Sequence, residues 1–299
     1  MIDGTMVSDN TTKRIVVVGG KGFIGSSLVS HLEAVKFPTL LISRSEFDLL
    51  NKDDCEAISA ILLPTDIIVF ASAITPARSP KDVIDSMSML YNFLIAVSGN
   101  ALDGFVLVSS DAVYGDFDGS VSENSPRNPN TFHGLAQLAR EMILDSSHIG
   151  RKVILRLCAV YGPGDTHNSY GPNRFISQII NKEPIKVLGS GLNRRDHIYI
   201  EDVVRLIVAV AQSGVSGTFN LASGVTYSFR DVAMACKEEF GQRSPIEYVG
   251  SEGFITNRII NVNRIRDFSE DSILRPLNLG LKQWKVHQES QIDAREKGN

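Results

Sequence analysis

One short segment near the N-terminus constrains the fold more than any other feature of the chain. Four consecutive apolar β-branched residues at 15–18 (IVVV) lead directly into a glycine-rich turn at 19–25 (GGKGFIG). Such an apolar run is typical of a strand buried on both faces of a parallel sheet. Leu28, Leu32 and Val35 then recur at i, i+4 and i+7, which indicates an amphipathic helix. The segment therefore predicts a strand, a tight turn and a helix.

The spacing of the glycines in this turn predicts a ligand. Glycines at three-residue intervals allow a tight turn, a close approach of the backbone to a pyrophosphate and close packing of helix on strand. The N-terminus of the helix would then direct free N–H groups at the phosphates. A ligand-free loop is the alternative, but the flanking strand and helix favour a dinucleotide site. Its candidate residues are Gly19, Lys21, Gly22, Phe23, Ile24 and Gly25.

The first half of the chain alternates between short apolar runs and helical patterns. Further strands are predicted at 40–42, 67–70, 105–108 and 153–155, and helices at 81–97 and 133–144. Alternation at this spacing predicts an α/β fold with a doubly wound parallel sheet of the Rossmann type.

The texture of the sequence changes from about Tyr161, where glycine and proline become dense. We predict an NAD(P)-binding Rossmann domain over 13–165, with late sheet elements from about 196–225. A smaller, interleaved C-terminal domain over 166–299 is expected to bind substrate. The polar tail after Trp284 is expected to be frayed.

Composition excludes several classes of function. A net charge of −4 argues against nucleic acid or an anionic membrane as a partner. Residues 1–12 lack the apolar core of a signal peptide, and no uninterrupted apolar run is long enough to span a membrane. Three widely spaced cysteines without a CxxC pair suit a reducing compartment and no metal site. We expect a cytoplasmic protein.

The end of the second predicted strand bears on the choice of cofactor. An acid there would bind the ribose hydroxyls of NAD, whereas a cation would pair with the 2′-phosphate of NADP. The chain has Ser43-Arg44-Ser45, and Lys21 in the turn could reach the same phosphate. Two cations favour NADP over NAD, unless both are ordinary solvated surface residues.

From about Arg14 to Leu281 the chain resembles the extended short-chain dehydrogenase/reductases, especially the nucleotide-sugar epimerases, dehydratases and reductases. The resemblance rests on landmarks in the family's order. They are the turn at 19–25, Asp48-Leu49, Ala71-Ser72-Ala73, the segment 109–115 (SSDAVYG), Arg156, the segment 160–164 (VYGPG) and the segment 195–202 (RDHIYIED).

The resemblance implies a role for each landmark. Asp48 and Leu49 would lie near the adenine, and Ala71, Ser72 and Ala73 would lie over the cofactor. Ser110 would hold the catalytic Ser/Thr position. Arg195 would grip the diphosphate of a nucleotide-sugar substrate. Asn173 would contact the diphosphate or the sugar, or alternatively cap a helix that begins near Phe175.

One departure from the family puts catalysis in doubt. The family uses a Tyr, which exchanges a proton with the sugar hydroxyl, and a Lys four residues later, which lowers the pKa of the Tyr and holds the nicotinamide ribose. Alignment on Gly134 and Glu141 places His133 and Gln137 at these positions. None of the seven tyrosines is followed by a Lys four residues later.

Two explanations remain open. His133 could transfer the proton, with Gln137 bonded to the ribose, an unperturbed imidazole pKa near 6.5 and Asp111 as the reserve acid. Alternatively, the chain is a catalytically silent NADP(H)-binding sensor or partner subunit. The first explanation implies a nucleotide-sugar epimerase or 4-keto reductase. Relatives often form dimers through the helices at 81–97 and 133–147, so a homodimer is possible by analogy.

Overall fold

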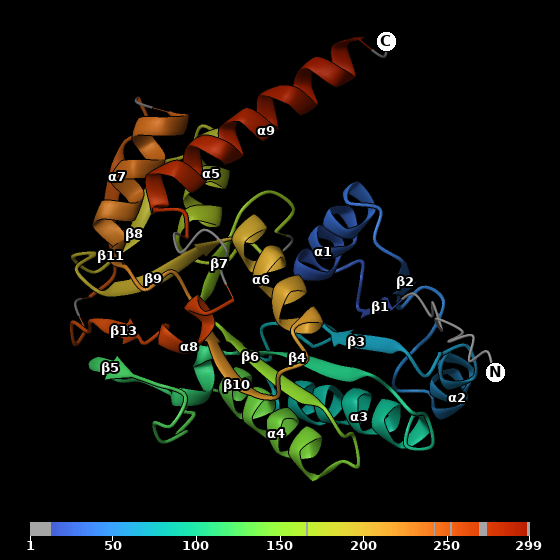
Figure 1. The fold of residues 1–299 in the computed structure, drawn as a ribbon. Helices are drawn as coiled ribbons and strands as arrows, with labels where there is room; N and C mark the ends of the chain where they lie inside the picture. Colours follow the sequence, from blue (N-terminus) through green and yellow to red (C-terminus); the bar gives the residue numbers. More distant parts are fainter. Residues whose placement is uncertain (1–12, 166, 242, 252, 269–273, 298–299) are drawn as a thin grey trace, which may run out of the picture.

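The computed structural model describes residues 13–165, 167–241, 243–251, 253–268 and 274–297 (Figure 1). The N-terminal segment 1–12, for which the sequence predicts no signal peptide, lies outside the described residues. None of the helices in these ranges combines the length and hydropathy that a membrane span requires.

Six parallel strands form the central sheet, in the order β10-β6-β4-β3-β1-β2. These strands are β1 (Arg14–Val18), β2 (Thr39–Ile42), β3 (Asp66–Phe70), β4 (Gly104–Ser110), β6 (Lys152–Leu157) and β10 (Gly217–Leu221). All five strands predicted over the first half are confirmed. The chain adds β2 on one side of β1 and then adds β3 on the other side, so the strand order reverses beside β1. Ligands of open α/β sheets bind at such a switch point.

The sheet is buried on both faces, as the apolar runs predict. Ile15 and Val17 of β1 belong to one hydrophobic core, whereas Val16 and Val18 belong to another. All four side chains are fully buried. Successive side chains of a strand point to opposite faces, so an uninterrupted apolar run supplies both cores at once.

Helices cover both faces of the sheet (Figure 1). On one face α1 (Phe23–Ala34) packs against α6 (Ile200–Gln212). On the other face α3 (Pro80–Ala96) packs against both α2 (Lys52–Ala60) and α4 (Phe132–Ser146). Two layers of helices around a parallel sheet are the predicted doubly wound architecture.

One position of the predicted first helix is wrong. Leu28 and Leu32 are fully buried on α1, but Val35 follows the last helical residue and is 58% exposed. The next residue, Lys36, has a φ of 55°, so the backbone turns out of the helix toward β2. The turn carries Val35 away from the apolar face.

The remaining elements build a smaller unit beside the carboxyl end of the sheet (Figure 1). Its strands are β5 (Gly119–Val121), β7 (Ala159–Tyr161), β8 (Ile185–Leu188), β9 (Arg194–Tyr199), β11 (Thr226–Ser228), β12 (Ile246–Val249) and β13 (Arg258–Ile260). Its helices are α5 (Pro172–Ile180), α7 (Phe229–Phe240), α8 (Asn263–Arg266) and α9 (Leu277–Lys297).

The two units interleave along the chain, with one difference from the predicted late sheet elements over 196–225. Only β10 from this range joins the central sheet, and α6 packs on α1. Strand β9 instead pairs with β7 and β11 in a separate three-stranded sheet. Strand β5 likewise pairs with β13, so residues from the first half contribute to the smaller unit.

The predicted fraying of the C-terminal tail is also wrong. Helix α9 continues past Trp284 to Lys297. Leu281 and Trp284 are buried, and the Trp284 ring packs edge-on against Phe240 of α7 with 5.9 Å between centroids. The polar sequence that follows is rich in strong helix formers, so the anchored helix can extend beyond its apolar contacts.

Candidate active site

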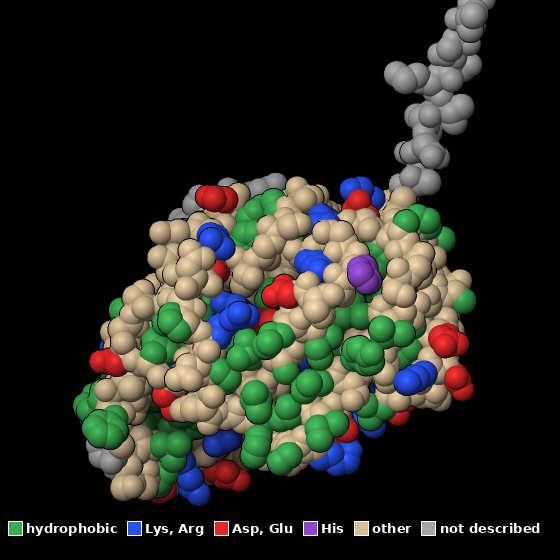
Figure 2. Space-filling view, turned by 90° about the horizontal axis from the view of Figure 1, so that it is seen from below, with side chains coloured by type: hydrophobic (Ala, Val, Ile, Leu, Met, Phe, Trp, Pro, Cys, Tyr) green, Lys and Arg blue, Asp and Glu red, His purple; other side chains and the backbone are tan. Residues whose placement is uncertain are grey.

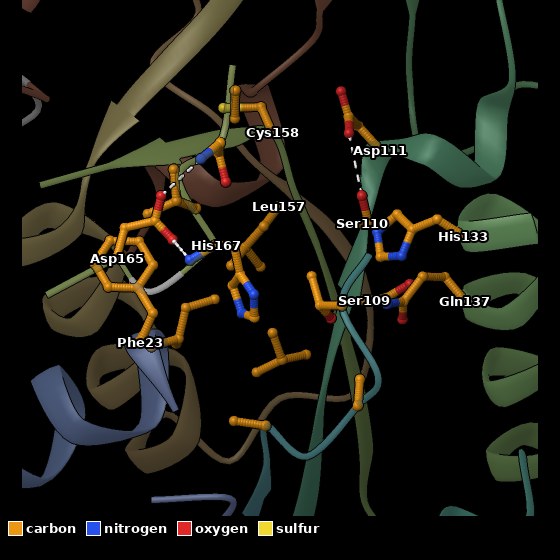
Figure 3. A pocket seen from close by; sticks show the side chains of 18 of the residues that line it. Phe23, Ser109, Ser110, Asp111, His133, Gln137, Leu157, Cys158, Asp165 and His167 are labelled. Atoms are coloured by element: carbon orange, nitrogen blue, oxygen red, sulfur yellow. Dashed lines mark hydrogen bonds between the residues drawn. The ribbon is translucent and has the colours of Figure 1, made fainter. Parts of the chain in front are cut away.

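A cavity of about 470 Å³ opens at the carboxyl end of the central sheet. Its lining comes from the glycine-rich turn, the end of β4, the first turns of α4 and the smaller C-terminal unit. Figure 3 shows Phe23, Asp165 and His167 on one side, facing Ser110 and His133 on the other. The fold therefore brings two predicted sites, cofactor and catalytic, into one space.

The glycines of the turn have different physical roles. Gly19 has a φ of 89°, and a Cβ there would lie 2.8 Å from the Ser72 amide nitrogen. A Cβ on Gly25 would lie 2.2 Å from the Gly19 carbonyl oxygen. A Cβ on Gly22 would meet only that oxygen, at 3.4 Å. Packing thus excludes side chains at Gly19 and Gly25, whereas the space beside Gly22 suits a ligand.

The start of α1 fits a pyrophosphate. Gly22 is the N-cap residue and offers no side-chain cap, and the first turn carries no acidic residue. The first N–H groups of the helix therefore point toward the turn without a protein acceptor, which is the arrangement that binds phosphate groups. Phe23, Ile24 and Gly25, all predicted cofactor residues, line the large cavity here.

A second cavity, of about 180 Å³, lies on the other side of the turn. It gathers residues that the sequence predicts for the pyrophosphate, the adenine, the 2′-phosphate and the space over the cofactor. They are Gly19, Lys21, Gly22, Arg44, Asp48, Leu49, Ala71, Ser72 and Ala73. The two cavities share Gly22, Ala71 and Ala73, so one extended dinucleotide could occupy both.

Contacts at this corner include an acid that the sequence analysis did not consider. Lys21 Nζ donates to Ser45 Oγ at 2.7 Å, and Arg44 is exposed. Ser43 Oγ donates to Glu46 Oε2 at 2.8 Å. Besides its two cations, the corner thus holds the Asp48 carboxylate in the cavity lining and the Glu46 carboxylate bonded to Ser43. Glu46 lies three residues beyond Ser43, in the turn that follows β2. Glu46 lies four residues beyond the last residue of β2, so the sequence analysis, which considered only the residues directly after the strand, missed it.

The four predicted catalytic residues all line the large cavity. Ser110, the last residue of β4, donates from Oγ to Asp111 Oδ1 at 3.2 Å and accepts from the Ala112 amide at 3.1 Å. His133 is the second residue of α4, whose start is fixed by Thr131 Oγ1 accepting from the Gly134 amide. Figure 3 shows the His133 ring beside Ser110.

The surroundings of His133 change the titration expected from the sequence. Burial lowers its pKa from 6.5 to about 4, and the positive charge of Arg140 adds to this effect, followed by His167. The imidazole Nδ1 is buried and has no hydrogen-bond partner among the described residues. A pKa near 6.5 is therefore wrong, and the imidazole is neutral at physiological pH.

Asp111 behaves in the opposite sense. Burial raises the pKa of its carboxyl, and the charges of Arg258 and Arg195, together with the Ser110 hydrogen bond, partly offset the rise. A carboxyl with a raised pKa is better suited to hold a proton than an ordinary aspartate is. Asp111 is thus placed to serve as an acid beside a neutral imidazole.

Gln137 lies one turn after His133 on α4 and is buried. Its Oε1 accepts from Arg140 Nη1 at 2.5 Å. Sequence reasoning missed Arg140, although one signal was available. It stands three residues after Gln137 and seven after His133, so it lies on the same helix face.

Arg195 lies in the large cavity, as the resemblance implies. Its Nη1 donates to Thr256 Oγ1 at 2.9 Å and to the Arg194 carbonyl at 2.8 Å. Burial, followed by the nearby charge of Arg258, lowers its pKa to about 10. Within the described residues it forms no salt bridge with a carboxylate, so its charge is available to an anion.

A second guanidinium in this region escaped the sequence analysis. Arg258 lines the same cavity, pairs with Asp116 and lies over the Phe117 ring, with its Cζ 5.1 Å from the centroid. It belongs to β13, far from Arg195 in sequence, and no motif surrounds it. The pairing of β13 with β5 and its packing against β9 bring it to the cavity.

Asn173 does not line the large cavity but lines a neighbouring one of about 290 Å³, together with Gly162 and Asp165. Its Oδ1 accepts from the Gly162 amide at 3.1 Å, and its Nδ2 donates to Asp165 Oδ2 at 2.6 Å. The expected helix start near Phe175 is wrong, because α5 begins at Pro172 with Gly171 as its N-cap. Asn173 holds the loop that carries Asp165, and direct substrate contact by Asn173 stays a prediction.

Comparison with known proteins finds relatives that act on nucleotide-sugars by name. Two curated relatives are an uncharacterized UDP-glucose epimerase of Bacillus subtilis and a dTDP-glucose 4,6-dehydratase of Streptomyces griseus. The first is 26% identical over 79% of this chain and 84% of its own length. The second is 29% identical over 80% of this chain and 82% of its own length.

Solved structures share the fold. The UDP-glucose 4-epimerase of Thermotoga maritima, solved with UDP-glucose, superposes with a TM-score of 0.82 at 20% identity, covering 93% of this chain and 99% of that one. The UDP-glucuronic acid 4-epimerase of Bacillus cereus, solved with UDP-glucuronic acid and NAD, gives 0.77 at 22% identity, covering 93% and 99%.

A family model matches residues 15–222, which extend from β1 through the last strand of the central sheet. This range includes the glycine-rich turn, the end of β4, α4 and Arg195. On this match over more than half of its length, the chain belongs to the NAD dependent epimerase/dehydratase family.

Proposed function

We propose that the protein is an NAD(P)-dependent nucleotide-sugar epimerase or 4-keto reductase with an atypical proton-transfer group. The observation that carries the proposal is Arg195, a guanidinium without a carboxylate partner in the described residues, in the cavity that also holds Ser110 and Asp111. A protein that bound only a dinucleotide would have no need of a cation such as Arg195 to bind a substrate diphosphate. The named activities of the epimerase and dehydratase relatives support the same substrate class.

The cofactor would occupy both cavities. The turn from Gly19 to Gly25 and the start of α1 would hold the pyrophosphate, and Asp48 and Leu49 would flank the adenine. Ala71, Ser72 and Ala73 would lie over the cofactor, with Gln137 at the nicotinamide end. The nicotinamide supplies or accepts the hydride, and the protein positions the sugar and moves the proton.

His133 would exchange the proton of the reacting sugar hydroxyl. Its neutral imidazole is a base at physiological pH, and Ser110 beside it would hydrogen-bond the reacting oxygen. Asp111, with its raised pKa, is the reserve acid. In this scheme Arg195 grips the diphosphate and so holds the sugar between His133 and the nicotinamide.

A catalytically silent NADP(H)-binding protein is the second candidate. The observation that favours it is the uncharged Gln137 at the position of the family's Lys, together with a His133 that lacks a hydrogen-bond partner on Nδ1 among the described residues. Such a protein would act as a sensor or as the partner of an active homologue.

The first prediction concerns the cofactor. Lys21 and Arg44 should favour the 2′-phosphate of NADP, whereas Glu46 opposes it through like charge. Arg44→Asp should weaken NADPH binding at least about tenfold, because charge-assisted hydrogen bonds contribute roughly 1–3 kcal/mol, and should change NADH binding little. Calorimetric titration measures both. Lys186→Asp, an exposed cation on β8 outside both cavities, is the control. Equal or tighter binding of NADH by the natural protein contradicts the NADP preference.

The second prediction concerns the substrate. Arg195→Ala should weaken binding of UDP, GDP or dTDP about tenfold to a hundredfold, since a bidentate guanidinium contact to phosphate is lost. NADPH affinity should not change. Arg194→Ala is the matched control, because this neighbour on β9 pairs with Asp231 and lies outside the cavity lining. If no nucleoside diphosphate binds the natural protein at millimolar concentration, the substrate class is wrong.

The third prediction concerns proton transfer. His133→Ala should lower kcat/KM about 10² to 10⁴-fold with 4-keto or 4-hydroxy nucleotide-sugars. Since the base form is the neutral imidazole and its pKa is about 4, activity should stay level from about pH 8 to about pH 6. It should fall only as the pH approaches that pKa. Nicotinamide absorbance and sugar isomerisation measure turnover, and circular dichroism at each pH controls for unfolding.

The outcomes of this experiment separate the candidates. Activity that survives in His133→Ala moves the proton-transfer role to Asp111 or another group. Ser110→Ala, run in parallel, tests the hydrogen bond to the reacting oxygen. If the natural protein turns over no substrate, His133→Tyr combined with Gln137→Lys restores the family's pair. Activity that appears only in this double variant identifies the natural protein as a silent binder.

The assembly proposed is a homodimer through α3 and α4. Ile84, Tyr91 and Ile95 on α3 and Leu135 and Met142 on α4 are all exposed. Figure 2 views the molecule from below Figure 1, where α3 and α4 lie, and shows hydrophobic side chains gathered on this face. A second copy would bury them, in accord with the dimers of related enzymes.

The fourth prediction tests this assembly. Ile95→Glu combined with Met142→Glu should convert a dimer into a monomer, because like charges would be buried at the contact. Light scattering after size exclusion gives the mass. Met234→Glu, an equally exposed apolar residue on α7, should leave the dimer intact. A monomeric natural protein rules the assembly out.

A further inference from the structure

Arg140 is the largest of the fully buried side chains in the described protein, with 0% exposure. It lies on α4, where its guanidinium joins three elements. Nη1 donates to the Val108 carbonyl of β4 at 3.3 Å and to Gln137 Oε1 at 2.5 Å, and Nη2 donates to the Ser72 carbonyl at 2.9 Å. Each of these acceptors belongs to a residue that lines one of the two cavities.

The charge of Arg140 has no carboxylate partner within ion-pair distance in the described ranges. The adjacent Glu141 is engaged elsewhere, since its two oxygens accept from Arg156 at 2.9 and 2.8 Å, from Ser109 at 2.7 Å and from Arg127 at 3.3 Å. The Arg140 Nε also lacks a hydrogen-bond partner among these residues. Burial lowers the pKa of Arg140 to about 10, so the side chain remains charged at neutral pH.

A buried cation with only neutral acceptors is costly, because transfer of the charge from water is offset only by dipoles. Unpaired buried charges therefore tend to serve function. The cavity beside Arg140 is expected to bind an anionic ligand, since the cofactor expected there carries phosphates. From this position we infer that the charge of Arg140 serves the ligand that binds in the cavity and does not serve to stabilise the core.

The hydrogen bond to Arg140 determines which end of the Gln137 amide faces the cavity. An amide can present either its oxygen or its nitrogen. Arg140 can only donate, so it selects the oxygen and leaves Nε2 with no hydrogen bond to any described residue. Gln137 lines the cavity, so its two N–H donors are available to a ligand.

We propose that Arg140 and Gln137 together replace the single Lys that the family places at position 137. Arg140 supplies the positive charge, one helical turn further along α4, and Gln137 supplies the donor that reaches the nicotinamide ribose. Arg140 is a positioning residue, since it acts through Gln137 and through its field on His133. The inference rests on the proposed function for its chemistry.

Other charged groups also face His133 and must be held constant in a test. Asp111 approaches from the 3₁₀ turn (Asp111–Tyr114) packed against α4, and His167 approaches from the opposite wall of the cavity. Arg195 and Arg258 act on Asp111 from the smaller unit. A change at Arg140 leaves all four in place, so a shift in His133 titration reports on Arg140.

The test compares Arg140→Met, Arg140→Lys and the double variant Arg140→Met with Gln137→Lys. Affinities for NADH and NADPH are measured by calorimetry, and His133 titration by NMR of histidine-labelled protein. Arg140→Met should weaken cofactor binding about tenfold, which is the effect of one lost oriented donor, and should raise the pKa of His133. Arg140→Lys should retain affinity within about threefold, since it keeps the charge.

The double variant is the decisive arm. It returns the cation to position 137, so cofactor affinity should recover to within about threefold of the natural protein. Arg127→Met is the matched control, because Arg127 contacts the same Glu141 but neither lines the cavity nor touches Gln137. It should change neither cofactor affinity nor His133 titration.

Two results overturn the inference. One is unchanged affinity and unchanged His133 titration in Arg140→Met. The other is weakened binding that neither Arg140→Lys nor the double variant rescues, since that pattern belongs to a structural role. Should Arg140→Met fail to fold, Gln137→Leu must weaken cofactor binding while leaving His133 titration unchanged, or the pair does not act as proposed. No arm uses a sugar nucleotide, so failure of the nucleotide-sugar proposal is a separate result.

Discussion

The arrangement of the active site depends on a buried ion pair between Arg156 of β6 and Glu141 of α4. Two parallel hydrogen bonds of 2.9 and 2.8 Å join them, and Glu141 also accepts from Ser109 of β4. Arg156 further donates to the Tyr114 hydroxyl. The pair fixes the rotation and height of α4 against the sheet. Removal of one partner would leave an uncompensated charge, at a cost of roughly 3–5 kcal/mol.

The fixed helix in turn sets the electrostatics of the cavity. His133, Gln137 and Arg140 share the face of α4 that the ion pair holds against β4. Arg195 and Arg258 approach from the other unit. A protein with a net charge of −4 therefore concentrates three guanidiniums around one cavity. This favours anionic ligands. Burial, and after it the charge of Arg140, lowers the pKa of His133 and keeps its imidazole neutral.

The central sheet and the cofactor turn could be predicted because their determinants are local. The apolar run at 15–18 supplies both cores of the parallel sheet, and the glycines at 22 and 25 meet their constraints within the turn itself. Gly19 has the positive φ of a tight turn, although the backbone that it approaches is that of Ser72. The errors occur where distant contacts decide. Val35 leaves its helix as the chain turns toward β2, and the tail past Trp284 stays helical because α9 is anchored on α7.

The sequence by itself determined the fold class, the glycine-rich turn after the first strand and the lack of any Tyr followed by a Lys four residues later, since each is a statement about residue type and spacing. Only the tertiary structure decided how the substitutes are charged and paired. The lowered pKa of His133 arises from burial and from Arg140, and the donor end of Gln137 is set by the same guanidinium. Arg258 reaches the cavity through the pairing of β13 with β5 and the packing of β13 against β9. Burial and electrostatic fields depend on which groups meet in space, and a linear spacing does not contain that information.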